Sequence, residues 1–407
     1  MAIRTIRQIK DLNGRVVFLR VDFNVPLKRG KVLEEFKIIQ SLKDIDYLLE
    51  RGVKLIIATH LGSPQGKVVV DLSTKPIANL LSKIIKQPVK FLSVTKTKDL
   101  VPAQRIIAQM KPGQVVFLEN LRFNPGEQKD DLKWAKSLAS LADIYINNAF
   151  AVCHRADASV SAIKKFLPSF VGLLLEQEIV NLNKVLHPKK PLVVLIGGAK
   201  IETKTTLIKN LFKSASQILV GGALANSFLV AQGYEVGKSM VDSDSIKVAK
   251  TLLQKNRTLF SRRPKIILPL DVVTSSNLTK DHLIGSKNII KIKASDRVGK
   301  GEYICDIGPE TIGLFSKYIK RAQTIVWNGP MGLFEVPNFR HGTVIMARLI
   351  ASRASGHAYG VIGGGETIEA LNLSKMAEYM DWVSTGGGAM LAYLGGEKLP
   401  GLKGLVK

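Results

Sequence analysis

Short runs of β-branched and other apolar residues recur along the chain, and each is followed by a turn and then by a stretch with helical spacing. The runs lie at Val16–Val21, Lys54–Ala58, Val115–Leu118, Ile144–Ile146, Leu192–Ile196, Gln217–Val220, Thr324–Trp327 and Ala358–Ile362. Near-continuous apolar strands that alternate with helices are typical of parallel sheets covered on both faces. The predicted fold class is therefore α/β, with parallel sheets in three-layer lobes.

The length of 407 residues suits two domains of roughly 150–200 residues rather than one core. The segment Val171–Leu186 has helical spacing and ends at His187-Pro188, where proline stops a helix. We therefore expect a first lobe over residues 1–170, a connecting helix over 171–187 and a second lobe over 188–389.

Several classes of protein are disfavoured by the sequence. No apolar run approaches the roughly 20 residues that cross a bilayer, and the N-terminal residues lack a signal-peptide pattern. The only cysteines, Cys153 and Cys305, are far apart, which argues against a zinc site or a disulfide framework. We expect a cytoplasmic protein without a membrane partner.

The formal net charge of +26 has two interpretations. It could attract anions such as phosphorylated metabolites, nucleotides or nucleic acid, or it could be spread over solvated faces without a partner. The basic residues occur along most of the chain, and their richest stretch, Lys255–Lys300, lacks the interleaved aromatic residues of a nucleic-acid platform. The second interpretation is favoured, and a nucleic-acid partner is not expected.

Ligands bind beyond the carboxyl ends of parallel strands, and the two halves differ there. First-half strands are followed by polar residues: Asp22-Phe23-Asn24, His60-Leu61-Gly62-Ser63, Glu119–Arg122, and Asn147-Asn148 leading to His154-Arg155. Second-half strands are followed by glycine turns: Gly197-Gly198, Gly221-Gly222, Asn328-Gly329 and Gly363-Gly364-Gly365. Glycine allows close backbone approach, and the following helix offers free N–H groups to phosphate. The four turns together predict a nucleotide site.

The nucleotide site does not follow the best-known patterns. No GxxxxGK[ST] loop occurs, and Gly197-Gly198-Ala199 is not a GxGxxG fingerprint. Lys200 and Lys204 are four residues apart at a helix start, so they share a face and could neutralise a transferring phosphoryl group. Two solvated surface lysines are the alternative. Ser384–Gly388 could be an anion-binding turn or a hinge.

Eight strings resemble the phosphoglycerate kinase family: Arg20–Pro26, His60–Gly62, Glu119–Phe123, His154–Ala156, Gly197–Lys200, Asp306–Thr311, Val326–Glu335 and Ser384–Ala389. They cover nearly the whole chain in order. The resemblance implies phosphoryl transfer between 1,3-bisphosphoglycerate and ADP, giving 3-phosphoglycerate and ATP, with Mg²⁺. It also implies two Rossmann-like lobes joined by a hinge, a monomer, and a C-terminal segment, residues 390–407, that packs back on the first lobe.

The resemblance also implies roles for individual residues. Catalytic roles fall on Lys37, Lys200 and Lys204. Binding of the acid substrate falls on Asp22, Phe23, Asn24, His60, Leu61, Gly62, Ser63, Arg122 and Arg155. Nucleotide binding falls on Gly197, Lys204, Gly222, Gly308, Asn328, Glu335, Gly364, Gly365, Glu366 and Thr367, with Glu366 as the magnesium ligand.

The chain departs from the family pattern at several of these positions. Lys37 stands where the family has a catalytic arginine, and a lysine is a point charge without the planar fork of a guanidinium. Ser63 also replaces an arginine, and Glu366 replaces an aspartate. Smaller changes of charge are Asn148 for aspartate and Asp157 for histidine.

These departures leave three functions open. The first is an active phosphoglycerate kinase with compensating side chains. The second is a low-activity paralogue that acts as a nucleotide-responsive scaffold for anions or nucleic acid. The third is a kinase for another small carboxylic acid. The first is favoured, because Lys37 keeps the positive charge and the glycine turns of the second half are intact.

Overall fold

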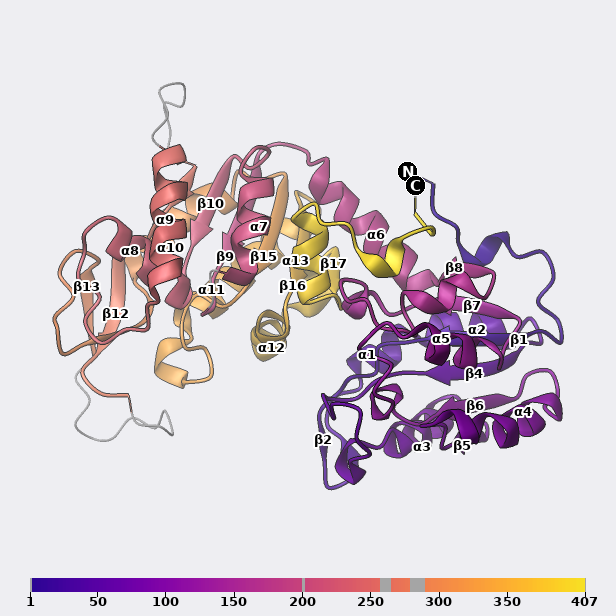
Figure 1. Cartoon of the computed structure of the whole chain (residues 1–407). Helices are drawn as coiled ribbons and strands as arrows, with labels where there is room; N and C mark the ends of the chain where they lie inside the picture. The colour runs from indigo at the N-terminus through magenta and orange to yellow at the C-terminus, as the bar shows by residue number, and fades with distance from the viewer. Residues whose placement is uncertain (1, 200–201, 257–264, 279–289, 407) are drawn as a thin grey trace. The chain divides into compact units, whose positions relative to one another are not determined.

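A computed structural model describes residues 2–199, 202–256, 265–278 and 290–406 (Figure 1). Contacts between Cα atoms divide the chain into two compact units, Met1–Val180 with Lys398–Lys407, and Asn181–Glu397. The connecting helix α6 spans Leu173–Leu186 and so contains the boundary between the units. It ends directly before His187-Pro188, as the sequence predicts.

The first unit is built on a six-stranded parallel sheet in the order β5-β6-β4-β1-β7-β8. Its strands are β1 Val16–Arg20, β4 Lys54–Ala58, β5 Val89–Leu92, β6 Val115–Leu118, β7 Ile144–Asn147 and β8 Ser169–Val171. Its further elements are the hairpin β2 Leu27–Lys28 and β3 Lys31–Val32, and the helices α1 Phe36–Gln40, α2 Leu42–Leu49, α3 Lys75–Ile84, α4 Leu100–Ala108 and α5 Leu132–Ala139.

Alternation along the strands of this sheet creates two cores, one on each face. Val17 and Leu19 of β1 pack with residues of α1, α2 and α3, whereas Phe18 between them packs with residues of α4 and α5. All three side chains are fully buried. Because successive side chains point to opposite faces, one strand contributes to both cores, which gives the predicted three layers.

The second unit also contains a six-stranded parallel sheet, in the order β11-β10-β9-β15-β16-β17. Its strands are β9 Leu192–Ile196, β10 Gln217–Val220, β11 Ile266–Ile267, β15 Thr324–Asn328, β16 Tyr359–Gly363 and β17 Trp382–Ser384. Its helices are α7 Glu202–Leu211, α8 Gly222–Ala231, α9 Ser243–Asn256, α10 Pro309–Ile319, α11 His341–Ala354, α12 Gly365–Ser374 and α13 Gly388–Leu394.

A small antiparallel sheet is added to this second unit, in the order β13-β12-β14 (Figure 1). Its strands are β12 Asp271–Ser275, β13 Ile290–Ala294 and β14 Tyr303–Ile307. The apolar runs predicted only parallel strands, so this small sheet was not predicted from the sequence. Ser384–Gly388, left open above, links β17 to α13.

Residues 398–407 belong to the first unit, whereas residues 390–394 complete α13, which packs against α7 in the second. The Gly401 N–H donates to the Cys153 carbonyl at 2.9 Å, and Ile3 pairs with Val406 in an antiparallel bridge. Lys164 Nζ donates to the carbonyls of Pro400 and Lys403 at 2.7 and 2.9 Å. Residues 400–406 therefore contact several segments of the first unit.

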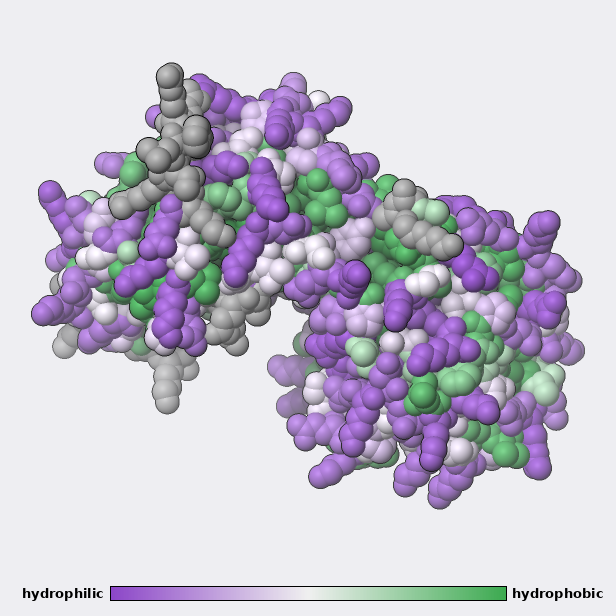
Figure 2. Space-filling view, turned by 45° about the horizontal axis from the view of Figure 1, so that its top comes forward, coloured by the Kyte–Doolittle hydropathy of each residue, from purple (hydrophilic) through white to green (hydrophobic). Residues whose placement is uncertain are grey.

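Hydrophilic residues are distributed over the visible face of each unit, with smaller apolar areas between them (Figure 2). Among the residues that the structure describes, no helix has the length and hydropathy needed to cross a membrane.

Candidate active site

The carboxyl ends of β1 and β4 bring together a cluster of polar side chains in the first unit. These strands are adjacent and parallel, so Asp22, which follows β1, lies beside His60, which follows β4, and both side chains are buried. Lys37 Nζ, on α1, donates to Asp22 Oδ2 at 2.7 Å and to the Asn24 carbonyl at 3.2 Å. The predicted catalytic cation Lys37 is therefore paired with the predicted ligand Asp22.

A second set of contacts joins Asn24, Gly62 and Arg122. Asn24 Oδ1 accepts from the Gly62 N–H at 2.9 Å, and the Arg122 guanidinium donates to the Gly62 carbonyl at 2.8 Å. Arg122 also faces Asp157 Oδ2 at 3.4 Å, and both of these side chains are buried. The buried guanidinium of Arg122 needs a partner of opposite charge. This ion pair gives a structural reason for an aspartate at residue 157, where the family pattern has histidine.

His60 is held neutral by its surroundings. Burial, followed by the positive charges of Arg20, Arg122, Lys37 and Arg155, keeps the pKa of His60 well below its ordinary value of 6.5. His60 Nδ1 lies 3.2 Å from an Arg20 nitrogen and 3.8 Å from Asp22 Oδ1. Lys37 is paired with Asp22 and Arg122 with Asp157, and Arg20 faces Glu127 through Ser159, so the net positive charge of this pocket comes from the exposed Arg155. A net positive charge suits an anionic ligand.

Four further predicted residues have different surroundings. The Phe23 side chain is buried in the core and stacks on Phe117, with ring centroids 6.3 Å apart. The Leu61 side chain is buried as well. Ser63 and Arg155 are exposed, and Arg155 Nε lies 3.3 Å from His154 Nε2. Phe23 and Leu61 can therefore reach a ligand only through their backbones.

In the second unit, the predicted glycine turns after β9, β10 and β15 come together at one sheet edge. The Gly197 N–H donates to the Asn328 carbonyl at 3.0 Å, and the Gly222 N–H donates to the Met331 carbonyl at 2.9 Å. Gly222 has φ of +61°, and a Cβ atom there would lie 2.5 Å from the Gly198 nitrogen. Only glycine fits at residue 222, because both its backbone angle and its neighbours exclude a side chain.

Lys204 extends from α7 into these turns. Its Nζ donates to the Gly197 carbonyl, and its side chain is 7% exposed. Burial lowers the pKa of Lys204 to about 8, and the nearby Glu366 carboxylate opposes that shift. Two solvated surface lysines were the alternative at this helix start, and Lys204 is not one of them. Lys200, the other predicted catalytic lysine, lies outside the described residues.

The fourth glycine turn, after β16, contributes Gly364 and the start of α12. Asn328 Nδ2 donates to the Gly363 carbonyl at 2.6 Å, and the Gly329 N–H donates to Thr367 Oγ1 at 2.7 Å. Both predicted side chains, Asn328 and Thr367, are therefore buried links between turns. Gly365 and Glu366 are exposed in the first turn of α12.

Glu366 can be tested as a magnesium ligand. A Cβ atom built on Gly198 would lie 2.8 Å from Lys204 Nζ and 3.3 Å from Glu366 Oε2, so the carboxylate faces the same space as the lysine. Within the described residues, no three His, Cys, Asp or Glu side chains form a metal cluster. Mg²⁺ commonly binds through one or two carboxylates together with substrate phosphates, and a single carboxylate beside phosphate-binding turns fits that mode.

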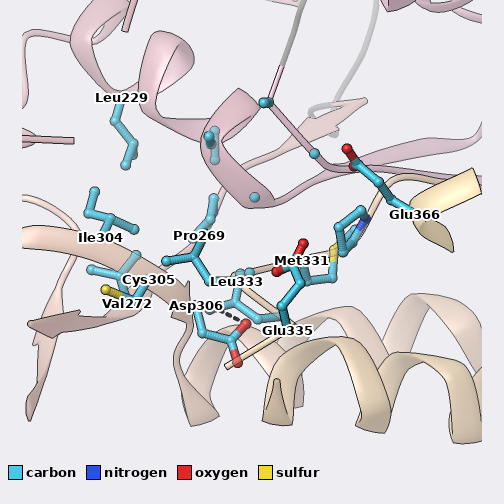
Figure 3. Close-up of a pocket in the computed structure, with 18 residues that line it drawn as sticks. Leu229, Pro269, Val272, Ile304, Cys305, Asp306, Met331, Leu333, Glu335 and Glu366 are labelled. Carbon is cyan, nitrogen blue, oxygen red and sulfur yellow. Dashed lines mark hydrogen bonds between the residues drawn. The ribbon is translucent and has the colours of Figure 1, made fainter. Parts of the chain in front are cut away.

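A pocket in the second unit opens from these turns to an apolar wall (Figure 3). Gly198, Gly222, Glu335 and Glu366 are among its lining residues, and Glu366 lies on the opposite side of the view from Leu229 and Ile304. The apolar wall comprises Leu229, Pro269, Val272, Ile304, Met331 and Leu333. A glycine and carboxylate end next to an apolar wall suits a ligand with phosphates at one end and a flat apolar ring at the other.

Gly308 is not among the residues that line this pocket, although its neighbour Ile307 is. It precedes α10, whose first N–H groups donate to the Asp271 carboxylate, at 3.1 Å from Glu310 and 2.7 Å from Thr311. A Cβ atom on Gly308 would lie 2.2 Å from Asp271 Oδ2. This contact explains the glycine structurally, and nucleotide binding by Gly308 stays a prediction.

Two buried charged residues near the sites were not singled out from the sequence. Arg20, the last residue of β1, contacts His60. Asp306, at the pocket, accepts from the Gly342 N–H at 2.7 Å, and burial raises the pKa of Asp306 to about 7. Arg20 and Asp306 both belong to strings that resemble the family. The sequence does not reveal toward which side of the strand each side chain points, so neither was predicted as part of a site.

Comparisons with known proteins agree with this pair of sites. The family model for phosphoglycerate kinase matches residues 6–397. Phosphoglycerate kinases of Pelotomaculum thermopropionicum and Moorella thermoacetica are each 40% identical to the chain, over 409 and 410 residues that span the whole of both proteins.

Solved structures give the same result. A phosphoglycerate kinase structure from Coxiella burnetii matches with a TM-score of 0.83 at 34% identity, and one from Pyrococcus horikoshii with 0.81 at 30%. Each match covers 99% of this chain and 98% of the other. The predicted pair of Rossmann-like lobes is confirmed by these neighbours and by the two parallel sheets.

Proposed function

The chain belongs to the phosphoglycerate kinase family and is a phosphotransferase, and from this premise we propose how its residues carry out the reaction. The reaction moves a phosphoryl group between 1,3-bisphosphoglycerate and ADP, giving 3-phosphoglycerate and ATP. The scaffold and the other-acid kinase, both left open above, find no support among the relatives.

The cluster of the first unit is proposed to bind the acid. Arg122, Arg155 and His60 would contact its phosphate or carboxylate, and Asp22 and Asn24 its glycerate part. The support is the net positive charge around His60, which an anion would neutralise. Lys37 would neutralise charge that develops on the transferring phosphoryl group, while Asp22 orients its ammonium.

The pocket of the second unit is proposed to bind ATP or ADP. The apolar wall would hold the base, Glu335 the ribose, and the turns at Gly198, Gly222 and Gly364 the phosphates. Lys204 would donate to the transferring phosphoryl group, because its ammonium faces the same space as Glu366. Lys200 is proposed to assist it by family resemblance alone.

Mg²⁺ is proposed to bind through Glu366 and the nucleotide phosphates. A bound Mg²⁺ would neutralise phosphate charge during transfer. Glutamate carries its carboxylate one methylene further than the aspartate of the family pattern, so this chain would hold the ion with a longer arm.

Phosphoryl transfer depends more on positioning and charge neutralisation than on acid–base chemistry. A cluster of arginines and lysines with a neutral His60 suits that requirement. We propose that the two units close around their substrates by a hinge and exclude water, so that ATP is not hydrolysed. We further propose a monomeric, cytoplasmic enzyme.

The observation that carries this proposal is the Lys37–Asp22 pair beside the neutral His60. The test is a coupled spectrophotometric assay with 3-phosphoglycerate and MgATP on the purified wild-type protein and on Lys37→Arg. We expect turnover by both. Folded wild-type protein without turnover above background would contradict the proposal.

A further inference from the structure

Arg20 is a fully buried arginine directly beneath the proposed acid site. It has no exposed surface, so it cannot touch a ligand itself. Its Nε donates to Ser159 Oγ at 2.9 Å, one terminal nitrogen donates to the Val21 carbonyl, and the other lies 3.2 Å from His60 Nδ1. All three guanidinium nitrogens therefore have partners within the protein.

Ser159 and Glu127 hold this guanidinium from behind. Ser159 Oγ donates to Glu127 Oε1, and the Ser159 N–H donates to Glu127 Oε2 at 3.2 Å. Ser159 and Glu127 are both fully buried. The Ser159 hydroxyl thus links the carboxylate of Glu127 to the guanidinium of Arg20. The two buried groups of opposite charge face each other across this one hydroxyl.

The contact between Arg20 and His60 determines which imidazole nitrogen carries the proton. A guanidinium is always protonated and only donates, so His60 Nδ1 must accept. The proton of the neutral imidazole is then on Nε2. Within the described part of the chain Nε2 has no hydrogen-bond partner, and it is not among the fully enclosed side-chain atoms. It is left as a donor that a ligand can use.

We propose that Arg20, braced by Ser159 and Glu127, is a positioning residue that holds His60 as a neutral Nε2–H donor toward the acid substrate. The inference rests on the proposed role of His60 in binding that acid. Its chemical consequence is that His60 contributes a directed hydrogen bond rather than a charge, while the arginines supply the charge.

The groups around His60 favour this state together. Lys37, Arg122, Arg155 and Arg20 all oppose an imidazolium. Asp22 favours one, but its carboxylate is 3.8 Å from Nδ1, which is too long for a hydrogen bond, and it is engaged by Lys37. The KM for 3-phosphoglycerate is therefore not expected to follow a histidine titration between about pH 5.5 and 8.

The direct test is a nitrogen-15 spectrum of the full chain labelled at its six histidines, recorded without substrate. His60 is assigned as the signal lost in His60→Gln. We expect an unprotonated Nδ1 and a protonated Nε2 at every pH from 5.5 to 8. A protonated Nδ1, or an imidazolium that titrates in that range, would overturn the proposal. Because no turnover is needed, an inactive protein with the expected spectrum would refute the proposed function alone.

Ser159→Ala tests the bracing without removing the buried charge of Arg20. We expect the tautomers of His60 to mix and the KM for 3-phosphoglycerate to rise about tenfold, roughly the worth of one hydrogen bond, with a much smaller change in kcat. The matched control is Ser169→Ala, a buried serine on β8 of the same sheet whose Oγ donates to the Leu167 carbonyl at 2.7 Å. An unchanged His60 spectrum in Ser159→Ala, or equal changes in KM in both variants, would overturn the bracing role.

Discussion

Lys204→Met is expected to make the second unit more stable while it removes activity. The pKa of Lys204 is about 8 in the folded protein and about 10.5 in an unfolded chain. Because the folded value is the lower one, the cost of burying the ammonium is present in full below pH 8. It disappears as the pH rises from 8 to 10.5, where the unfolded state binds more protons than the folded state.

The difference of about 2.5 pKa units corresponds to about 3 kcal/mol at pH 7. Methionine avoids this cost but loses the hydrogen bond from Nζ to the Gly197 carbonyl, worth about 1–2 kcal/mol for a charged donor. The free energy of unfolding should therefore rise by about 1–2 kcal/mol at pH 7. For a unit of this size the midpoint temperature should rise by about 2–8 °C.

The measurement is thermal unfolding at pH 7 and at pH 10, together with the coupled assay. Turnover should fall about 10²–10³-fold, as when one donor to a developing charge is removed. Lys209→Met is the matched control, since Lys209 lies exposed on the same helix, and its stability should change by less than about 0.5 kcal/mol. A less stable Lys204→Met, or a gain that persists at pH 10, would refute the reasoning.

Substitutions at Lys37, Gly222 and Glu366 test other contacts. Lys37→Ala should lower kcat on the order of 10³-fold, whereas Lys37→Arg should match or exceed wild type; an active alanine variant would show that Lys37 is not the catalytic cation. Gly222→Ala should lower the free energy of unfolding by more than 2 kcal/mol in denaturant, because its Cβ would lie 2.5 Å from the Gly198 nitrogen. The control is Gly233→Ala, at a glycine with φ of +92° and open space around it, which should lose only the backbone strain of about 1 kcal/mol. Equal losses in the two would exclude the clash. Glu366→Gln should raise the Mg²⁺ concentration needed for half-maximal rate at least tenfold, and an unchanged magnesium titration would remove Glu366 as the ligand.

Periodicity predicted the eight central strands to within a residue, because long apolar runs such as Leu192–Ile196 are buried on both faces. It missed the four edge strands of the two large sheets. Exposed Lys90 interrupts the run in β5, β11 has only two residues, and β8 and β17 have three each. The small antiparallel sheet includes β13, whose sequence Ile-Lys-Ile-Lys alternates with period two. That alternation was a usable signal for a strand, although Ile290 and Ile292 are exposed rather than buried.

The candidate sites were predicted as strand ends, but their pairings were not. Lys37 reaches Asp22 only because α1 starts where the chain returns to the end of β1, and no spacing rule encodes that return. Arg20 is in a quoted string, yet a strand residue can point to either face. Lys204 contacts Gly197 after β9 and faces Glu366 after β16, and only the folded sheet brings these two turns together.

The first unit includes residues from both ends of the sequence, since Arg4 donates to the Leu405 carbonyl and Ile3 pairs with Val406. During synthesis on the ribosome, the whole of Asn181–Glu397 emerges before the last ten residues can join the first unit. The second unit can therefore complete its fold first, although its sequence comes later. Until the last ten residues are made, Cys153 and Lys164 lack their contacts with Gly401 and Pro400. The first unit, although its sequence is made first, therefore remains an incomplete domain until the end of synthesis.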